Sequence, residues 1–92
     1  MPVTVRIPTP LQRLTAGKAE VTCRATSIAG LLEALESEHP GIKERLTEGG
    51  KVRRFINIYV NGEDIRTLKA ETTAVNDGDS VAIIAAIAGG NG

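Results

Sequence analysis

The chain has 92 residues, enough for a single domain with one small hydrophobic core. Its 11 basic residues balance 11 acidic ones, so it lacks the excess positive charge that drives nucleic-acid binding, and its charge indicates no membrane partner. Aromatic residues make up only 2% of the chain, and it has one cysteine and one histidine. Base stacking is therefore disfavoured, and disulfide frameworks, cysteine-rich zinc sites and iron–sulfur ligation within one chain are excluded.

The sequence shows no targeting signal and no set of catalytic groups. Its N-terminus lacks the basic-then-apolar pattern of a signal peptide, and no apolar run approaches the roughly 18 residues of a membrane span, so we expect a cytoplasmic protein. The histidine and cysteine form no nucleophile–base pair, and no glycine-rich phosphate loop joins a strand to a helix. This inventory argues against an enzyme.

The first quarter of the chain predicts two antiparallel strands. Apolar and polar residues alternate over residues 2–7 and again over 18–25, which is the pattern of strands with one buried face. A loop containing Gly17 separates them. Cys23 falls on the apolar side of the second strand, so we interpret it as a packed thiol and not as a reactive one.

The period then changes to that of a helix. Thr26 or Ser27 can cap its first turn, and Pro40-Gly41 ends it. His39, at that end, is interpreted as a solvated or carbonyl-capping side chain. A second short helical turn is expected before Gly49-Gly50. The apolar stripes that define these helices are Ile28, Leu31, Leu32 and Leu35, then Ile42 and Leu46.

The second half of the chain predicts three further strands. Residues 55–60 are the most strand-like run and are expected at the centre of the sheet, and Asn61-Gly62 predicts a tight hairpin to a short return strand over 63–66. A polar stretch with Leu68 and Val75 as core anchors leads to a last strand over 80–85. Because one helix cannot cover both faces of a sheet, we expect a mixed sheet curled over the main helix.

The last residues lose side-chain bulk step by step until only Gly-Gly-Asn-Gly remains. We therefore divide the chain into a folded domain, 1–85, and a flexible tail, 86–92. A frayed terminus is one interpretation of such a tail. The other is a thread that enters another protein's pocket, since the six residues from Ala85 to Gly90 can span roughly 20 Å when extended.

The order of these elements, together with NIYVNGEDIR (57–66), NDGDSVAII (76–84) and the terminal Gly89-Gly90, resembles the ubiquitin-like sulfur carriers of the ThiS/MoaD family. The resemblance covers nearly the whole chain. It implies an α+β protein with the β-grasp fold, in which a mixed sheet of four to five strands curls over one main helix. Residues 54–66 and 85–90 look most like the carriers that serve cysteine biosynthesis.

The resemblance also implies a protein co-substrate with no active site and no bound cofactor or metal. An adenylyltransferase of the ubiquitin-activating type would use ATP and magnesium to adenylate the carboxylate of Gly90, and a sulfur donor would convert it to a thiocarboxylate. A synthase, with the cysteine synthase type favoured, would then accept the sulfur. The residues before this carboxylate would enter the enzyme's site as a thin thread, because glycine adds no side chain. These tail residues are Ile87, Ala88 and Gly89.

The chain departs from the family pattern at its end, where Asn91-Gly92 follow the diglycine. Gly90 therefore has an amide carbonyl where adenylation requires a free carboxylate. The resemblance implies that the Gly90–Asn91 bond is hydrolysed first, by a zinc peptidase of the JAMM type. The rival hypothesis is that Gly92 itself is activated.

Partner docking and pathway are less well defined by the sequence. We predict docking through the sheet face beside the tail, while a basic cluster formed by Lys51, Arg53 and Arg54 is interpreted mainly as solvated surface. Molybdopterin and thiazole synthesis are alternative pathways. A protein modifier joined to lysines, or a binding module that needs no tail, are the alternatives outside sulfur transfer. The residues chosen for docking are Ile58, Val60, Arg66 and Ile83.

Overall fold

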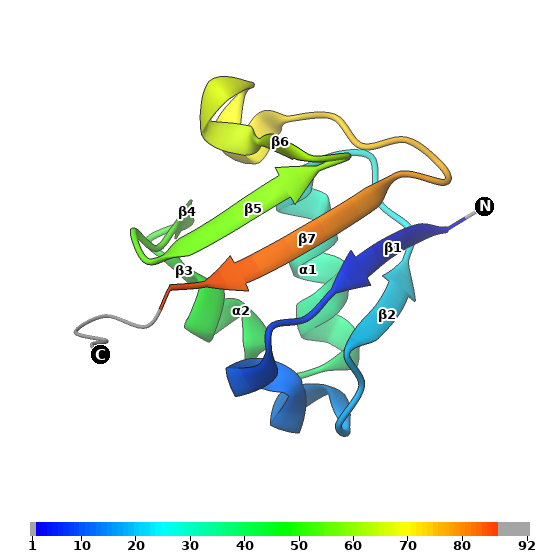
Figure 1. The fold of residues 1–92 in the computed structure, drawn as a ribbon, viewed down its shortest axis with the longest axis vertical. Helices are drawn as coiled ribbons and strands as arrows, with labels where there is room; N and C mark the ends of the chain where they lie inside the picture. The colour runs from blue at the N-terminus through cyan, green and yellow to red at the C-terminus, as the bar shows by residue number, and fades with distance from the viewer. Residues whose placement is uncertain (1, 87–92) are drawn as a thin grey trace.

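The computed structural model describes residues 2–86, which form a mixed five-stranded sheet with helices on one face (Figure 1). The order across the sheet is β2-β1-β7-β5-β6. β1 and β7 are parallel, and the other neighbours are antiparallel. The strand bounds are β1 Val3–Arg6, β2 Glu20–Cys23, β5 Ile56–Val60, β6 Glu63–Asp64 and β7 Ser80–Ala85.

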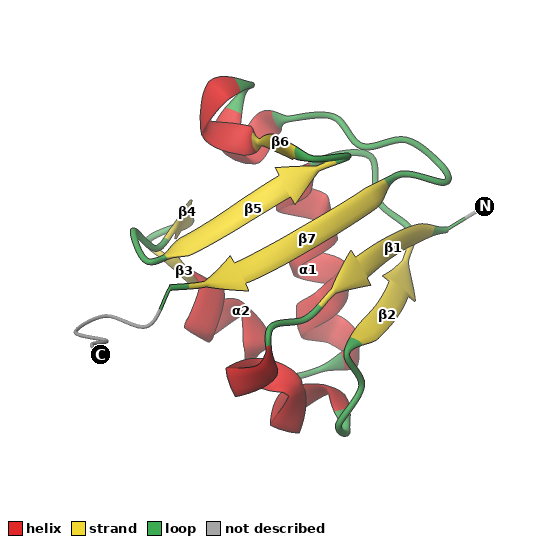
Figure 2. Cartoon of the chain, viewed as in Figure 1, coloured by secondary structure: helices red, strands yellow, loops and turns green. Residues whose placement is uncertain are grey.

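α1 and α2 lie behind the sheet (Figure 2), which confirms the predicted mixed sheet over one main helix. α1, Ile28–Glu38, is the main helix, and α2, Ile42–Leu46, follows it closely. A second, two-stranded sheet is formed by β3, Thr47–Glu48, and β4, Lys51–Val52. Three 3-10 helices complete the described chain: η1 Thr9–Thr15, η2 Ile65–Thr67 and η3 Ala70–Thr72.

The central strand is β7, and not β5 as predicted. Val81 pairs with Val5 of β1 on one side and with Val60 of β5 on the other. β5 therefore lies next to the centre, and its outer edge is covered by β6 at only two register positions. The strength of its β-branched pattern reports burial on one face and says nothing about position across the sheet.

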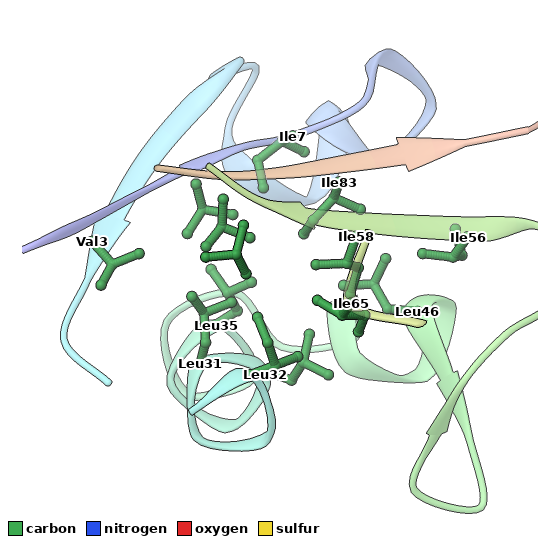
Figure 3. Close-up of a cluster of buried hydrophobic side chains, with 14 of the residues drawn as sticks. Val3, Ile7, Leu31, Leu32, Leu35, Leu46, Ile56, Ile58, Ile65 and Ile83 are labelled. Atoms are coloured by element: carbon green, nitrogen blue, oxygen red, sulfur yellow. The ribbon is translucent and has the colours of Figure 1, made fainter. Parts of the chain in front are cut away.

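One core fills the space between the sheet and the helices (Figure 3). Every second residue of the strands points toward α1, because side chains alternate between the two faces of a strand. The members with at most 1% exposure include Val5, Ile58, Val81 and Ile83 from the sheet, and Ile28, Leu31, Leu35, Ile42 and Leu46 from the helices.

The ends of α1 follow the capping signals in the sequence. Ser27 is the N-cap, and its Oγ accepts a hydrogen bond from the N–H of Gly30 at 3.1 Å. Gly41 has φ +99°, a conformation that favours glycine, and turns the chain into α2. The carboxylate of Glu36 accepts hydrogen bonds from the N–H groups of Gly41 and Lys43, which lowers its pKa.

Two parts of the fold differ from the prediction. The segment expected as a plain loop contains η1, which buries Leu11 against the core, while the hydroxyl of Thr15 donates to the carbonyl of Lys18 at 2.7 Å. Val75 is a core anchor as predicted, but Leu68 is 39% exposed, so that prediction was wrong. Leu68 ends η2 on the surface, where the chain turns before η3.

The side chains of Cys23 and His39 have no hydrogen-bond or ion-pair partner among residues 2–86. Cys23 is half-buried at the edge of the core, and burial, with a smaller effect of Glu38, raises the pKa of its thiol. His39 is the C-cap of α1, and its backbone N–H donates to the carbonyl of Leu35. Within residues 2–86 there is no group of three or more side chains suited to hold a metal ion, and no helix there is long and apolar enough to cross a membrane.

Candidate functional site at the end of the central strand

The candidate site begins where β7 ends. Ala85 pairs with Ile56, and the N–H of the exposed Ala86 donates to the carbonyl of Phe55 at 2.8 Å. Ala86 is therefore fixed to the sheet and faces solvent. Ile87, Ala88, Gly89, Gly90 and the Gly90–Asn91 bond lie outside the described residues, as do all but the first residue of the predicted tail 86–92, so those predictions stay predictions.

The two neighbours of β7 do not extend equally far. Its pairing with β1 stops at Ala82, whereas its pairing with β5 continues to Ala85. Pro8, the N-cap of η1, has no N–H to continue the β1 ladder, and the chain turns away into η1. The end of β7 thus has a strand on one side and a gap on the other, as Figure 1 shows.

A cleft of about 520 Å³ lies at this gap. The buried side chains of Leu11 and Ile56 contribute to its lining, as does the ring of Phe55, which is 44% exposed. Two alanines at the end of β7 form part of the wall, and the remaining walls come from η1, α2 and the segment before β5. These lining residues are Pro10, Glu44, Arg45, Arg53, Ala85 and Ala86.

Two arginines, Arg45 and Arg53, line the cleft, and only Arg53 has its charge paired. Arg53 donates to the backbone carbonyl of Glu44 at 3.2 and 3.0 Å and lies 3.4 Å from the Glu48 carboxylate. The guanidinium groups of Arg45 and Arg54 have no hydrogen-bond or ion-pair partner within residues 2–86. Of the basic cluster predicted as solvated surface, Arg53 therefore lines the cleft, and Arg54 is an exposed neighbour in the sequence.

Three of the four predicted docking residues are in the wrong place. Ile58, Val60 and Ile83 are 1%, 7% and 1% exposed, and Figure 3 shows Ile58 and Ile83 pointing into the core. They belong to the face that packs on α1, so they cannot contact a partner through the outer face. β7 has apolar residues at both alternating positions, so the sequence alone could not assign its faces, whereas in β5 Asn57 and Tyr59 alternate with the buried residues and mark the outer face.

Arg66, the fourth predicted docking residue, is exposed but already has structural partners. One guanidinium nitrogen donates to Asn57 Oδ1, and the other donates to the carbonyl of Ile56 at 2.8 Å. The carboxylate of Asp64 lies 3.8 Å away. Arg66 thus covers the start of β5, on the edge that β6 leaves unpaired.

The outer face of the sheet presents residues that the sequence analysis did not select. Ile84 is 48% exposed and lies opposite Asn57 in the β5–β7 register, and Tyr59 lies opposite Ala82 on the same face. Ile84 and Phe55 are exposed large apolar side chains beside the end of β7. Alternation from Val81 could have placed Ile84 on the outer face once Val81 was known to be buried.

The family is decided by a match over most of the chain: the ThiS family profile covers residues 5–90. The chain belongs to the ThiS family. Sulfur carrier protein CysO of Mycobacterium tuberculosis is 45% identical to this ThiS-family chain over 93 residues, which cover 98% of this chain and 100% of the relative. Small archaeal modifier protein 3 of Haloferax volcanii is 36% identical over 64 residues, 70% of each chain.

Solved structures agree with this family assignment. A chain in the crystal structure of the BexX/CysO complex from Amycolatopsis orientalis superposes with a TM-score of 0.90 at 41% identity, covering 92% of this chain and 96% of that one. The predicted β-grasp fold is therefore confirmed. The prediction that this ThiS-family chain is a protein substrate and not an enzyme is confirmed too, because relatives of this kind are carrier proteins.

Proposed function

We propose that this chain carries sulfur for cysteine biosynthesis as a thiocarboxylate on Gly90. A partner of the ubiquitin-activating type, with ATP and magnesium, joins the Gly90 carboxylate to AMP and releases pyrophosphate. A sulfide-level sulfur donor then attacks the acyl carbon, so that a C–S bond forms as the bond to AMP breaks. In a synthase of the cysteine synthase type, the thiocarboxylate sulfur forms a bond to the activated acceptor. Water then hydrolyses the bond between the acyl carbon and the sulfur, which leaves the Gly90 carboxylate for the next cycle.

The observation that carries the proposal is the position of Ala86. It is exposed, hydrogen-bonded to Phe55, and four residues before Gly90 in the sequence. The pairing of β7 with β5 continues to Ala85, and the bond from Ala86 to Phe55 extends it, so the starting point of the tail is fixed relative to the body. A partner that binds the body is therefore positioned relative to the start of the tail. The 45% identity to a protein named as a sulfur carrier supports the same function.

In this chemistry, the side chains of the carrier take no part in bond making or breaking. The partner must supply the charges that stabilise the adenylate, in a closed site that excludes water. The carrier contributes the acyl carbon and its placement. Glycine at positions 89 and 90 suits a narrow entrance, because a side chain there would widen the thread and restrict its φ angle.

Removal of Asn91-Gly92 is part of the proposal. As written, the sequence has an amide at Gly90, and an amide carbonyl has no oxygen anion with which to attack ATP. Hydrolysis by a zinc peptidase of the JAMM type would create the carboxylate. Intact-mass analysis of the protein from its native cell should show loss of both residues, and a full-length population that carries sulfur would contradict this step.

The central experiment uses the Gly90-ending form, the full-length chain and a Gly90-ending form with Gly90→Ala. Each is incubated with the purified adenylyltransferase, ATP, magnesium and sulfide, and intact mass is measured. The Gly90-ending form should gain the mass of one oxygen-to-sulfur exchange, while the full-length chain should not. If no form gains sulfur, sulfur carriage is refuted; if only the full-length chain does, Gly92 is the carrying residue.

A protein-modifier function is the second candidate, because a modifier protein from Haloferax volcanii is 36% identical over 64 residues. A modifier would share the adenylation step but pass its acyl carbon to a lysine amine. The pathways are separated by offering the thiocarboxylate form to a cysteine synthase with its amino-acid acceptor, and to the molybdopterin and thiazole synthases in parallel. Transfer of sulfur identifies the pathway, whereas an isopeptide-linked lysine in the native cell identifies a modifier.

A further inference from the structure

The cleft beside Ala86 has features of a binding surface for an enzyme that receives the tail. It lies at the root of the tail, its floor is apolar, and its rim has unpaired positive charge. This inference rests on the proposed function, because it concerns the adenylyltransferase that acts on Gly90. It adds a specific contact on the body of the carrier to the contact that the tail itself makes.

The length of the tail requires that the partner's surface come close to this cleft. Gly90 is four residues beyond Ala86, and an extended chain covers at most about 3.3–3.6 Å per residue. The acyl carbon therefore lies within about 14 Å of a residue that lines the cleft. An enzyme that encloses Gly90 must therefore come within this distance of Ala86, which lines the cleft.

The apolar part of the cleft suits one apolar side chain from the partner. Phe55 is 44% exposed, although it lies between Arg54 and the buried Ile56, and Leu11 lies at the base of the same cleft. An aromatic ring that remains half exposed next to an apolar hollow is the kind of surface that interfaces bury. The cleft is open at the surface, so a side chain can enter it without movement of the core.

The charges around the cleft indicate which partner residues would lie beside the apolar side chain that enters it. Arg45 and Arg53 line it together with a single acidic residue, Glu44, and Arg53 pairs with Glu48, which is not one of the lining residues. Arg45 and Arg54 have no side-chain partner within the described chain, residues 2–86. This local excess occurs in a chain whose net charge is zero, so it is a feature of this site. Carboxylates on the partner would complement it.

The geometry points to the cleft between η1, α2 and the end of β7 as the docking site for an apolar side chain flanked by carboxylates at the tail entrance of the adenylyltransferase. Phe55 and Leu11 form the apolar contact, and Arg45 on the rim pairs with the carboxylates. The cleft thereby determines how tightly the carrier binds, while the tail determines what reacts.

The test measures ATP–pyrophosphate exchange by the purified adenylyltransferase as a function of the concentration of the Gly90-ending carrier. Two cleft variants are used, Arg45→Glu and Phe55→Ala. Each has a matched control far from the cleft: Arg24→Glu, an exposed arginine at the end of β2 beside the start of β1, and Leu68→Ala, an exposed apolar residue after η2. Circular dichroism and urea unfolding establish that each variant is folded.

We expect each cleft variant to raise the KM for the carrier at least about tenfold with kcat nearly unchanged, because uniform binding is lost and the reacting atoms are not affected. The two controls should change KM by less than about threefold. A cleft variant that loses its fold is set aside, and the exposed Arg45→Glu, which removes no buried group, decides the result.

The outcomes separate this inference from the proposed function. If the wild-type carrier supports exchange and the folded cleft variants behave like their controls, the docking site is refuted while the adenylation of Gly90 stands. If the wild-type carrier supports no exchange, both are overturned. If Arg45→Glu raises KM and added salt weakens wild-type binding but not binding of this variant, the carboxylate contact is supported.

Discussion

Arg66 gives the sharpest test of a residue's role, because the sequence suggested docking and the structure shows internal contacts. Replacing it by alanine removes hydrogen bonds to the carbonyl of Ile56 and to the Asn57 side chain. The Ile56 carbonyl and Asn57 Oδ1 at the start of β5 would then have to accept hydrogen bonds from water in place of the guanidinium. We therefore expect Arg66→Ala to lower the free energy of unfolding, independently of any partner.

The size of the effect follows from the geometry. Hydrogen bonds to a charged group contribute about 1.5–3 kcal/mol when they are protected from water. The Arg66 side chain is 46% exposed, so water can replace much of this, and the Asp64 ion pair at 3.8 Å adds at most about 0.5 kcal/mol. The longer contacts to the carbonyls of Arg53 and Arg54, at 3.5 and 3.4 Å, contribute little. We expect a loss of about 1–1.5 kcal/mol in total.

Thermal unfolding resolves a change of this size, because 1 kcal/mol corresponds to roughly 4–8 °C in the melting temperature of a domain with 60–100 residues. Urea unfolding measures the same change as a free energy. Arg66→Lys should lie between wild type and Arg66→Ala, since an ammonium cannot reach both acceptors with the same fork geometry. A double-mutant cycle with Asn57→Ala should give a coupling energy of about 0.5–1 kcal/mol.

Arg54→Ala is the matched control, because its guanidinium has no partner within the described residues and its loss should cost less than about 0.5 kcal/mol. Equal stability of the Arg66→Ala and Arg54→Ala proteins would refute the structural role. Arg66 would then be free to act as the docking residue that the sequence suggested.

Four further outcomes test the fold and the domain boundary. Leu35→Ala, at a core position with 1% exposure, should cost about 2–5 kcal/mol in urea unfolding. Ser27→Ala removes the acceptor for Gly30 N–H and should cost about 0.5–2 kcal/mol, whereas Ser37→Ala on the exposed surface of α1 should cost little. Because two backbone N–H groups lower the pKa of Glu36 in the folded state, its carboxylate stabilises the fold above the ordinary glutamate pKa, and this is lost as the pH falls through the lowered value. Glu36→Gln should therefore reduce the loss of stability at acid pH, measured as the urea midpoint of unfolding against pH. The same loss of stability in the variant and the wild type would contradict the role of these hydrogen bonds. A chain that ends at Ala86 should unfold within about 0.5 kcal/mol of the full chain yet be inactive in adenylation; a larger loss of stability would move the boundary of the folded domain beyond residue 85.

Local sequence signals predicted the elements that local chemistry controls. Ser27 caps α1 because a short hydroxyl side chain reaches the free N–H groups of the first turn, and Gly41 ends the connection because its φ is positive. Asn61 and Gly62, with φ of +50° and +89°, form the hairpin that their residue types predict. The strand over residues 80–85 was predicted with the bounds that β7 has.

Features that depend on distant parts of the chain could not be predicted in this way. The face of Ile83 depends on where α1 packs, and the central position of β7 depends on its pairing with β1, which is far away in the sequence. η1 has Pro8 as its N-cap and Pro10 in its first turn, in a segment that was predicted as a loop. The cleft combines residues from four separate segments, so no single motif could have indicated it.

The pairing of β7 on both sides determines how the body responds when an enzyme draws on the C-terminus. A pull on Ala86 runs along the axis of β7, and the ladder bonds to β1 and β5 lie across that direction. These bonds are loaded in shear and share the force. If an edge strand were instead pulled away from its sheet, its hydrogen bonds would break one after another. A carrier whose tail continues the middle strand can therefore bear force on its C-terminus through many cycles of sulfur loading and release without unfolding.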